Sequence, residues 1–143
     1  MLPKKFSLAI THPHYEFWTD PSRHRIYHKV IGSWKDINAV GNYLKDARSA
    51  SIATGKIESV IVDLTEISIM QSEECIALQC EAMEAGLKAG IKIAAYVVSS
   101  ANAKTDILID KNYEKVAFPV AARFHQTKTA DDWLDQYVKK HFR

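Results

Sequence analysis

A short polar run, Gln71 to Glu74, holds the side chains best suited to chemistry or recognition. The hydroxyl of Ser72 can be phosphorylated, and it can also cap a helix, because a serine oxygen accepts a hydrogen bond from a backbone N–H two or three residues on. Glu73 follows at once, and the positive end of a helix dipole favours such carboxylates. The run predicts a capped helix start, which a partner protein could also contact.

Asp63 ends an apolar stretch, and α/β proteins often place functional groups at the ends of strands. An aspartate there can also accept hydrogen bonds from the turn that follows, which is the reading we favour. A small hydrolase or isomerase that uses Asp63 and a histidine is the enzymatic alternative. The sequence has no nucleophile elbow, no glycine-rich phosphate loop and no Cys-His pair at a diagnostic spacing, so we predict no catalytic residue and no enzyme.

Imidazole groups, which can bind metals, occur at His12, His14, His24, His28 and His125. No cysteine, aspartate or glutamate stands near them at a recognised ligand spacing, and zinc sites need three or four ligands. We therefore expect these histidines to face solvent, and we predict neither a metal nor another cofactor. Cys75 and Cys80 lie five residues apart on one predicted helix, so we expect them to stay unpaired as small apolar fillers.

The composition describes an ordinary soluble chain. Its 143 residues are 47% hydrophobic and 25% charged, with a net charge of +2. We expect a single domain over residues 1–143, with residues 1–14 as a less ordered extension. The charge is spread without long basic runs, which argues against nucleic acid as a partner. The apolar runs are far shorter than the roughly 20 residues of a membrane span, and no signal peptide is evident, so a cytoplasmic location is expected.

Two strands at about 15–19 and 24–31 are predicted to form a hairpin around Asp20-Pro21-Ser22, a sequence typical of a type I turn. A helix is then expected from Ser33, with Asp36 completing its cap. Its buried side repeats at helical spacing: Ile37, Val40, Leu44 and Ala47. Trp34, in the first turn before this stripe, is expected to be partly exposed and to line a groove or a dimer contact.

Strands and helices alternate over the rest of the chain. Apolar runs predict buried strands at 58–67 and 91–99, and a helix between them ends at Gly90. That helix is expected to bury Ile76, Cys80, Met83 and Leu87. Residues 102–118 are predicted as a helix that is broken near 110–112, and residues 121–126 as a short edge strand. The last helix is expected to start at a cap formed by Thr129 and Asp132 and to bury Trp133, Leu134, Tyr137 and Val138. This order predicts an α/β sandwich around a mixed, mostly parallel sheet.

The stretch from Val60 to Leu78, VIVDLTEISIMQSEECIAL, resembles the central motif of STAS domains, the family of anti-sigma-factor antagonists and of the cytoplasmic tails of sulfate transporters. Asp63-Leu64-Thr65 matches the first polar group of that motif and Ser72 its serine, while apolar positions match at Ile67, Ile69 and Met70. RHRIYHKVIGSWKDINAV and AARFHQTKTADDWLDQYV resemble other parts of the SpoIIAA-like branch. The resemblance extends over nearly the whole chain from about residue 15, and it implies a SpoIIAA-like fold and a regulatory domain that acts through another protein.

Three replacements separate the chain from the family motif. Gln71 stands where the family has an aspartate, and Glu73 and Glu74 stand where it has a serine or threonine and a glycine. In the antagonists a partner kinase phosphorylates the serine between these positions. Two carboxylates beside Ser72 would crowd a kinase and repel a phosphate, so the phospho-switch is not expected here.

Two further possibilities remain open from the sequence. One is a small-molecule or lipid carrier with an apolar pocket beneath its helices, because this fold type is similar in outline to lipid-carrier domains. The other is a homodimer formed through an edge strand or through Trp34. In both cases, as for a partner protein, the identity of the bound molecule cannot be read from the residues.

Overall fold

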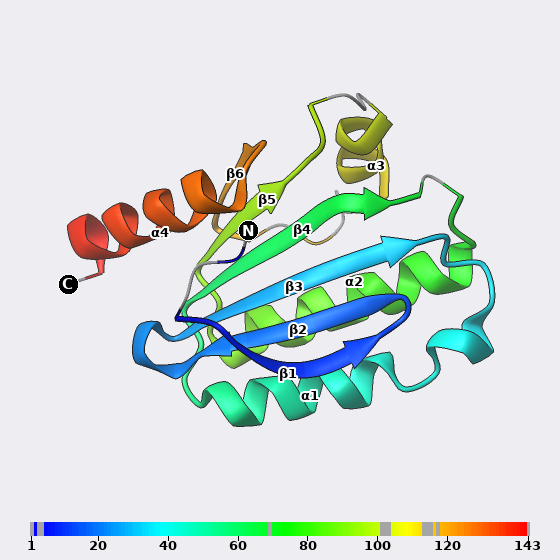
Figure 1. Cartoon of the computed structure of the whole chain (residues 1–143), viewed down its shortest axis with the longest axis horizontal. Helices are drawn as coiled ribbons and strands as arrows, with labels where there is room; N and C mark the ends of the chain where they lie inside the picture. Colours follow the sequence, from blue (N-terminus) through cyan, green and yellow to red (C-terminus); the bar gives the residue numbers. More distant parts are fainter. Residues whose placement is uncertain are drawn as a thin grey trace.

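A mixed β-sheet organises the chain (Figure 1). The structure is a computed structural model that describes residues 2, 5–68, 70–100, 104–112, 116 and 118–142. In these residues the sheet has six strands in the order in which they occur along the chain: β1 (Ser7–His12), β2 (Tyr15–Asp20), β3 (Arg25–Gly32), β4 (Ser59–Ile67), β5 (Ile93–Val97) and β6 (Val120–Phe124). The helical elements are η1 (Pro21–Arg23), η2 (Ile37–Val40), α1 (Tyr43–Thr54), α2 (Glu73–Ala89), α3 (Lys104–Asn112) and α4 (Thr127–His141).

The strand directions confirm the predicted α/β class. β1, β2 and β3 pair antiparallel, while β3 to β6 pair parallel. Each parallel connection passes through a helix, and α1 and α2 lie side by side on one face of the sheet while α4 lies on the other (Figure 1). No helix among the described residues is long and apolar enough to cross a membrane.

Most of the apolar side chains of strand β4 fall in one run, because both faces of the strand are covered there. Val60, Val62 and Leu64 belong to the core beneath α1, α2 and α3, whereas Ile61 belongs to the core beneath α4. A parallel strand buried on both faces loses the usual alternation of apolar and polar residues. The predicted strand at 58–67 is therefore present almost as expected.

The N-terminal residues differ from the prediction. Residues 1–14 were expected to form a less ordered extension, but Ser7–His12 forms β1, which pairs with β2 from Ser7 opposite Thr19 to His12 opposite Tyr15. Most side chains of β1 are exposed, so its hydrophobic pattern is weak. Hydrogen bonds to the β2 backbone position it, and such bonds leave no trace in the local sequence.

The helix expected from Ser33 begins later and in two steps. The carboxylate of Asp36 caps η2 by accepting from the Asn38 N–H at 2.9 Å, and α1 starts only at Tyr43, after Gly41 and its N-cap residue Asn42. The apolar spacing was read correctly, because Val40 is buried and its predicted companions pack on the same core.

The prediction that Trp34 is partly exposed is wrong. Its exposed fraction is 0%, and its indole N–H donates to the His14 carbonyl at 3.0 Å. The ring packs edge-on against Tyr43, with centroids 4.8 Å apart. Residues 33–36 are not helical, and the Trp34 side chain lies in the core, where it can line neither a groove nor a dimer contact.

Two other helices differ in part from their predicted patterns. On α2 the fully buried positions are Cys75 and Gln79, whereas the predicted Cys80, Met83 and Leu87 pack against the core while partly buried. Ile76 is also only partly buried. Helix α4 begins at Thr127 rather than at a cap on Thr129, and Asp132 instead pairs with Lys128. The expected break near 110–112 coincides with the end of α3, and residues 113–115 and 117 lie outside the described residues.

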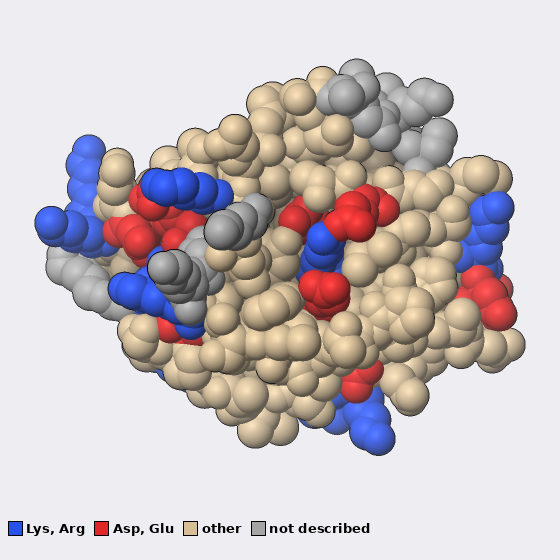
Figure 2. Space-filling model, viewed as in Figure 1, with Lys and Arg blue, Asp and Glu red and all other residues tan. Residues whose placement is uncertain are grey.

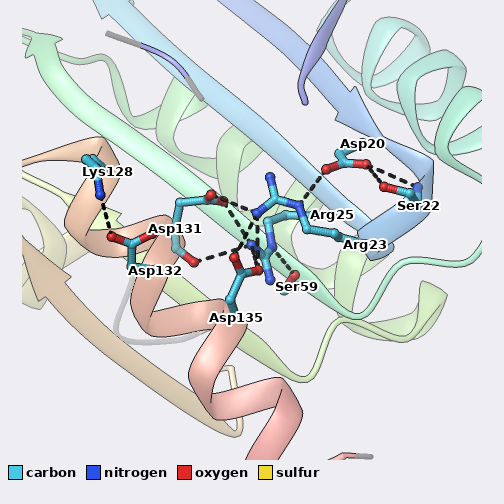
Figure 3. Close-up of polar contacts among 9 residues, drawn as sticks. All are labelled: Asp20, Ser22, Arg23, Arg25, Ser59, Lys128, Asp131, Asp132 and Asp135. Atoms are coloured by element: carbon cyan, nitrogen blue, oxygen red, sulfur yellow. Dashed lines mark hydrogen bonds and ion pairs between the residues drawn. The ribbon is translucent and has the colours of Figure 1, made fainter. Parts of the chain in front are cut away.

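A buried ionic network holds α4 against the sheet (Figure 3). Arg25 on β3 is 1% exposed; its Nε donates to Ser59 Oγ at 2.8 Å, and its Nη1 donates to Asp131 Oδ1 and to Asp135 Oδ1, both at 2.8 Å. Arg23 lies alongside and donates from Nη1 to Asp131 Oδ2 at 2.7 Å. Two arginines therefore share one buried carboxylate of α4, which fixes the position of the helix along the strands.

Removing that carboxylate should be costly. Asp131→Ala leaves Arg25 buried without its main counter-charge, and breaking a buried pair in this way typically costs about 3–5 kcal/mol. The adjacent Asp132→Ala, which removes an exposed partner of Lys128, should change the free energy of unfolding by less than about 0.5 kcal/mol. Urea denaturation of both variants checks this, and equal losses would contradict the anchoring role of the network.

Candidate functional site

The residues between β4 and α2 form a capped helix start, as predicted. Ser72 is the N-cap residue, in extended conformation, and its Oγ accepts from the Cys75 N–H at 3.2 Å. Glu73 and Glu74 occupy the first turn of α2 and are exposed. The serine oxygen thus accepts from one of the unpaired N–H groups at the helix start, and the two carboxylates lie where the helix dipole favours negative charge.

This junction is tied to the segment that leaves β3. The Ser72 N–H donates to the Trp34 carbonyl at 2.7 Å, and the Gln71 side-chain amide donates to the carbonyls of Ser68 at 2.7 Å and Gly32 at 3.3 Å. The Gln71 Oε1 accepts from the side chain of Gln79 at 3.0 Å. An ionised aspartate could not donate to these carbonyls, so Gln71 has a structural task here that the family's residue could not perform.

An exposed apolar side chain lies in the same stretch. Met70 is 55% exposed and precedes Gln71 by one residue. Its backbone N–H donates to Ser68 Oγ at 3.2 Å, so a hydrogen bond also holds the backbone at this residue. We call Met70, Gln71, Ser72, Glu73 and Glu74 the junction surface. It combines an apolar side chain with two carboxylates on a backbone held by hydrogen bonds.

Asp63 lies inside β4, which continues to Ile67, so the turn expected directly after it is absent and its carboxylate bonds within the sheet instead. Its Oδ1 accepts from the Thr65 N–H at 2.9 Å and from the Thr65 hydroxyl at 2.6 Å, and its Oδ2 accepts from the Tyr27 hydroxyl. Burial, and after it the charge of Asp63, raises the pKa of Tyr27 well above its ordinary value. Asp63 lies on the sheet face that carries α4, so the structure does not bring it together with the junction, which leads into α2 on the opposite face.

A hollow of about 920 Å³ lies over the sheet face beside α4, and Asp63 lines it. Lys29 stands opposite Glu16 on β2 and opposite Asp63 on β4, and it also pairs with Glu66. Figure 2 shows acidic side chains around a basic one in the middle of this face. Burial alone would lower the pKa of Lys29, but the bond and charge of Glu66 and the other two carboxylates raise it overall.

The hollow does not assemble a catalytic pair. His125 also lines it, but its Nδ1 lies 3.2 Å from the Val98 carbonyl, and the Asp63 carboxylate is taken by Tyr27 and Thr65. Threonine and lysine also line the hollow, and of these Thr65 bonds Asp63 and Lys29 pairs with Glu66. The described contacts therefore do not join Asp63 to a histidine.

A second cavity, a groove of about 320 Å³, lies between α1 and α2 above the sheet. Its walls are formed largely by small or apolar side chains of the two helices, and its floor by strands β2, β3 and β4. Its lining includes residues of both helices and of the three strands: Phe17, Ile26, His28, Tyr43, Ala47, Arg48, Ser51, Val60, Val62, Glu81, Ala82 and Gly86. The sequence suggests an apolar pocket beneath the helices as an alternative, next to the helix that carries Ile76 and Leu87, and the groove lies beside that helix.

His28, expected to face solvent, instead forms part of this floor. Its ring stacks on Phe17, with centroids 4.5 Å apart and planes 7° from parallel, and its Nε2 lies 3.1 Å from the Tyr43 hydroxyl. Burial lowers the pKa of His28 to about 3, which keeps the ring neutral at pH 7. The prediction failed because the strand alternation places position 28 beneath α1, which the hairpin pattern alone could not show.

Another of the histidines considered as metal ligands, His12, has structural contacts. His12 Nδ1 accepts from the His14 N–H at 3.0 Å, and the His12 ring stacks on Tyr15 at 4.2 Å. The described residues place one acidic group close enough to hold an ion, Asp131 with Asp132 and Asp135, and arginines already bond two of its carboxylates. Cys75 and Cys80 form no disulfide bond with each other.

No family model matches the sequence, and no curated protein matches it. In structure, the chain is similar to SiaC of Pseudomonas aeruginosa at 13% identity and a TM-score of 0.49, covering 80% of this chain and 94% of SiaC. It is similar to an uncharacterised DUF3478-family protein with a SpoIIAA-like fold from Shewanella loihica at 15% identity and a TM-score of 0.49, covering 90% of this chain and 91% of that one. It is also similar to a chain of the complex between diguanylate cyclase SiaD and its activator SiaC from Pseudomonas aeruginosa, at 15% identity and a TM-score of 0.45, covering 80% of this chain and 94% of the other. These likenesses concern the fold, and they assign no function to this chain.

The cap at Ser72 predicts a measurable loss. Ser72→Ala removes the acceptor for the Cys75 N–H and should lower the free energy of unfolding by about 1 kcal/mol, whereas Ser72→Gly should cost only a few tenths. Urea denaturation at pH 7 gives both values. A Ser72→Ala variant as stable as the wild type would show that the cap contributes nothing.

The neutral His28 predicts a pH dependence. In the unfolded chain this imidazole titrates near pH 6.5, but in the folded chain its pKa is about 3, so the unfolded state binds more protons between these values. Stability should therefore fall as the pH drops below about 6.5, and His28→Phe should reduce the fall. Denaturation midpoints at pH 7 and 4.5 test this, with His141→Gln, an exposed histidine, as the control. If His28→Phe lost as much stability as the control, the effect would not come from His28.

Proposed function

We propose that this chain is a non-enzymatic, cytoplasmic regulatory domain of the STAS/SpoIIAA-like type that binds another protein through the junction surface. The proposal rests on one observation. The exposed side chain of Met70 and the exposed carboxylates of Glu73 and Glu74 lie on one short segment that hydrogen bonds hold in place. Loops that present functional groups from a rigid scaffold are common places for recognition. Here the scaffold is the end of β4 and the start of α2.

The chemistry of the surface indicates what it would bind. An apolar side chain such as Met70 suits a small hydrophobic recess, because thioether side chains adapt to irregular surfaces. Two carboxylates at its edge favour lysine or arginine around that recess. The hydrogen bonds of Gln71 and Ser72 hold the surface in place before binding, which reduces the ordering cost that a flexible loop would incur. The expected partner is therefore a protein with a basic rim around an apolar recess.

The same geometry supports regulation without phosphorylation. The Ser72 hydroxyl is engaged in the cap, and a phosphate on it would meet the carboxylates of Glu73 and Glu74. Those carboxylates supply a constant negative charge where phosphorylated relatives acquire one.

A homodimer would have to form elsewhere than at Trp34, and the outer edges of β1 and β6 are the available strands.

Charge reversal at the junction tests the proposal. The partner is identified by affinity purification with the wild-type chain and is then titrated in purified form by calorimetry. Glu73→Lys with Glu74→Lys should weaken binding about tenfold or more, because attraction to a basic rim becomes repulsion.

The matched control is Glu81→Lys with Glu84→Lys, which makes the same charge change at exposed positions of the same helix. It should keep the wild-type affinity, and circular dichroism should show both variants folded. Wild-type affinity in the junction variant, or an equal loss in the control, would refute the junction as the contact surface.

A further inference from the structure

We propose that the groove between α1 and α2 is a binding site for an apolar small molecule that carries one uncharged hydrogen-bonding group, such as a hydroxyl, which pairs with His28. This site is separate from the junction surface, and the proposal does not depend on the proposed partner protein. Its support comes from the space between the helices, the apolar floor, and a single polar ring set into that floor.

The space arises because small side chains face one another across the groove. Ala47 and Ser51 line it from α1, and Ala82 and Gly86 line it from α2, each pair four residues apart and so on one face of its helix. At Gly86 an added Cβ would come within 2.8 Å of Ile91 Cδ1, so a larger residue there would require the Ile91 side chain to shift. The volume of about 320 Å³ lies at the lower end of the ~300–1,000 Å³ typical of ligand pockets.

The floor beneath the groove is apolar and incompletely covered. Phe17, Ile26, Val60 and Val62 line the groove and retain 4–7% exposure. When a ligand covers accessible apolar surface and removes it from water, binding becomes more favourable by roughly 25 cal/mol per Å². A ligand body made of hydrocarbon or aromatic carbon is therefore favoured.

His28 gives the floor its specificity. Its Nε2 is bonded to the Tyr43 hydroxyl, and within the described residues its Nδ1 makes no hydrogen bond. The ring is neutral at pH 7, so it can exchange one uncharged hydrogen bond with a ligand but cannot neutralise an anion. At the rim, Arg48 and Glu81 carry opposite charges, so the rim has no net charge with which to select an ionic head group. These features together favour a neutral polar group on the ligand.

The probe for the experiment is N-phenyl-1-naphthylamine, an uncharged naphthyl dye that brightens in apolar sites. The wild-type chain should enhance its fluorescence. Ala47→Trp, which fills the groove from α1, should abolish the enhancement, and Ser51→Trp provides an independent filling variant from the same helix. Ala53→Trp, at an exposed position of α1 outside the groove, is the matched control and should bind the dye like the wild type. Circular dichroism selects the filling variant that folds.

Two competitors of similar size test the hydrogen-bonding group. 1-Naphthol should displace the dye about tenfold more strongly than 1-methylnaphthalene, the equivalent of one net hydrogen bond of about 1.4 kcal/mol. In His28→Phe this preference should disappear while dye binding persists, because the phenyl ring preserves the stacking on Phe17. No enhancement by the wild-type chain, equal enhancement by a folded filling variant, or a preference that survives in His28→Phe would overturn the proposal.

Discussion

Strand β4 is the constraint on which the rest of the structure depends. It pairs with β3 on one edge and with β5 on the other, and its side chains enter both cores. A change in its register would move these side chains to the wrong face of the sheet and disrupt both cores. The end of the strand therefore has a fixed position. Asp63 bonds Thr65 within the strand, and the chain continues through Gln71 to the cap at Ser72. The rigidity of the junction surface follows from the burial of the strand that precedes it.

The two faces of the sheet are covered by different means, and each leaves an opening. On one face α1 and α2 cover the strands with small and apolar side chains and leave the groove between them. On the other face α4 stands alone, held by apolar residues and by Arg23 and Arg25 on Asp131, with the charged hollow beside it. A buried ionic network specifies one docking position where the apolar area is limited, at the cost of desolvating its charges. The groove and the hollow thus result from the same placement of helices that covers the two faces of the sheet.

Local signals in the sequence predicted local features well. The period change after β4, the cap at Ser72 and the stop at Gly90, whose φ is 115°, each depend on a few neighbouring residues, and the structure has all three. The misses depend on distant contacts. Trp34 is buried because Tyr15 and Tyr43 surround it, β1 exists because β2 offers it hydrogen bonds, and His28 is neutral because α1 lies above it. The arginine network joins residues more than 100 positions apart, so no local pattern could have indicated it.

The central claim is that a partner protein contacts the junction surface, and amide hydrogen exchange with and without the purified partner tests it most directly. The first N–H groups of a helix have no intrahelical acceptor, so the amides of Glu73 and Glu74 should exchange readily in the free chain. The account predicts that the partner slows exchange across residues 70–75 and leaves residues 43–54 of α1 unchanged. Protection confined to α1, to α4 or to the outer edges of β1 and β6, with residues 70–75 unaffected, would contradict it.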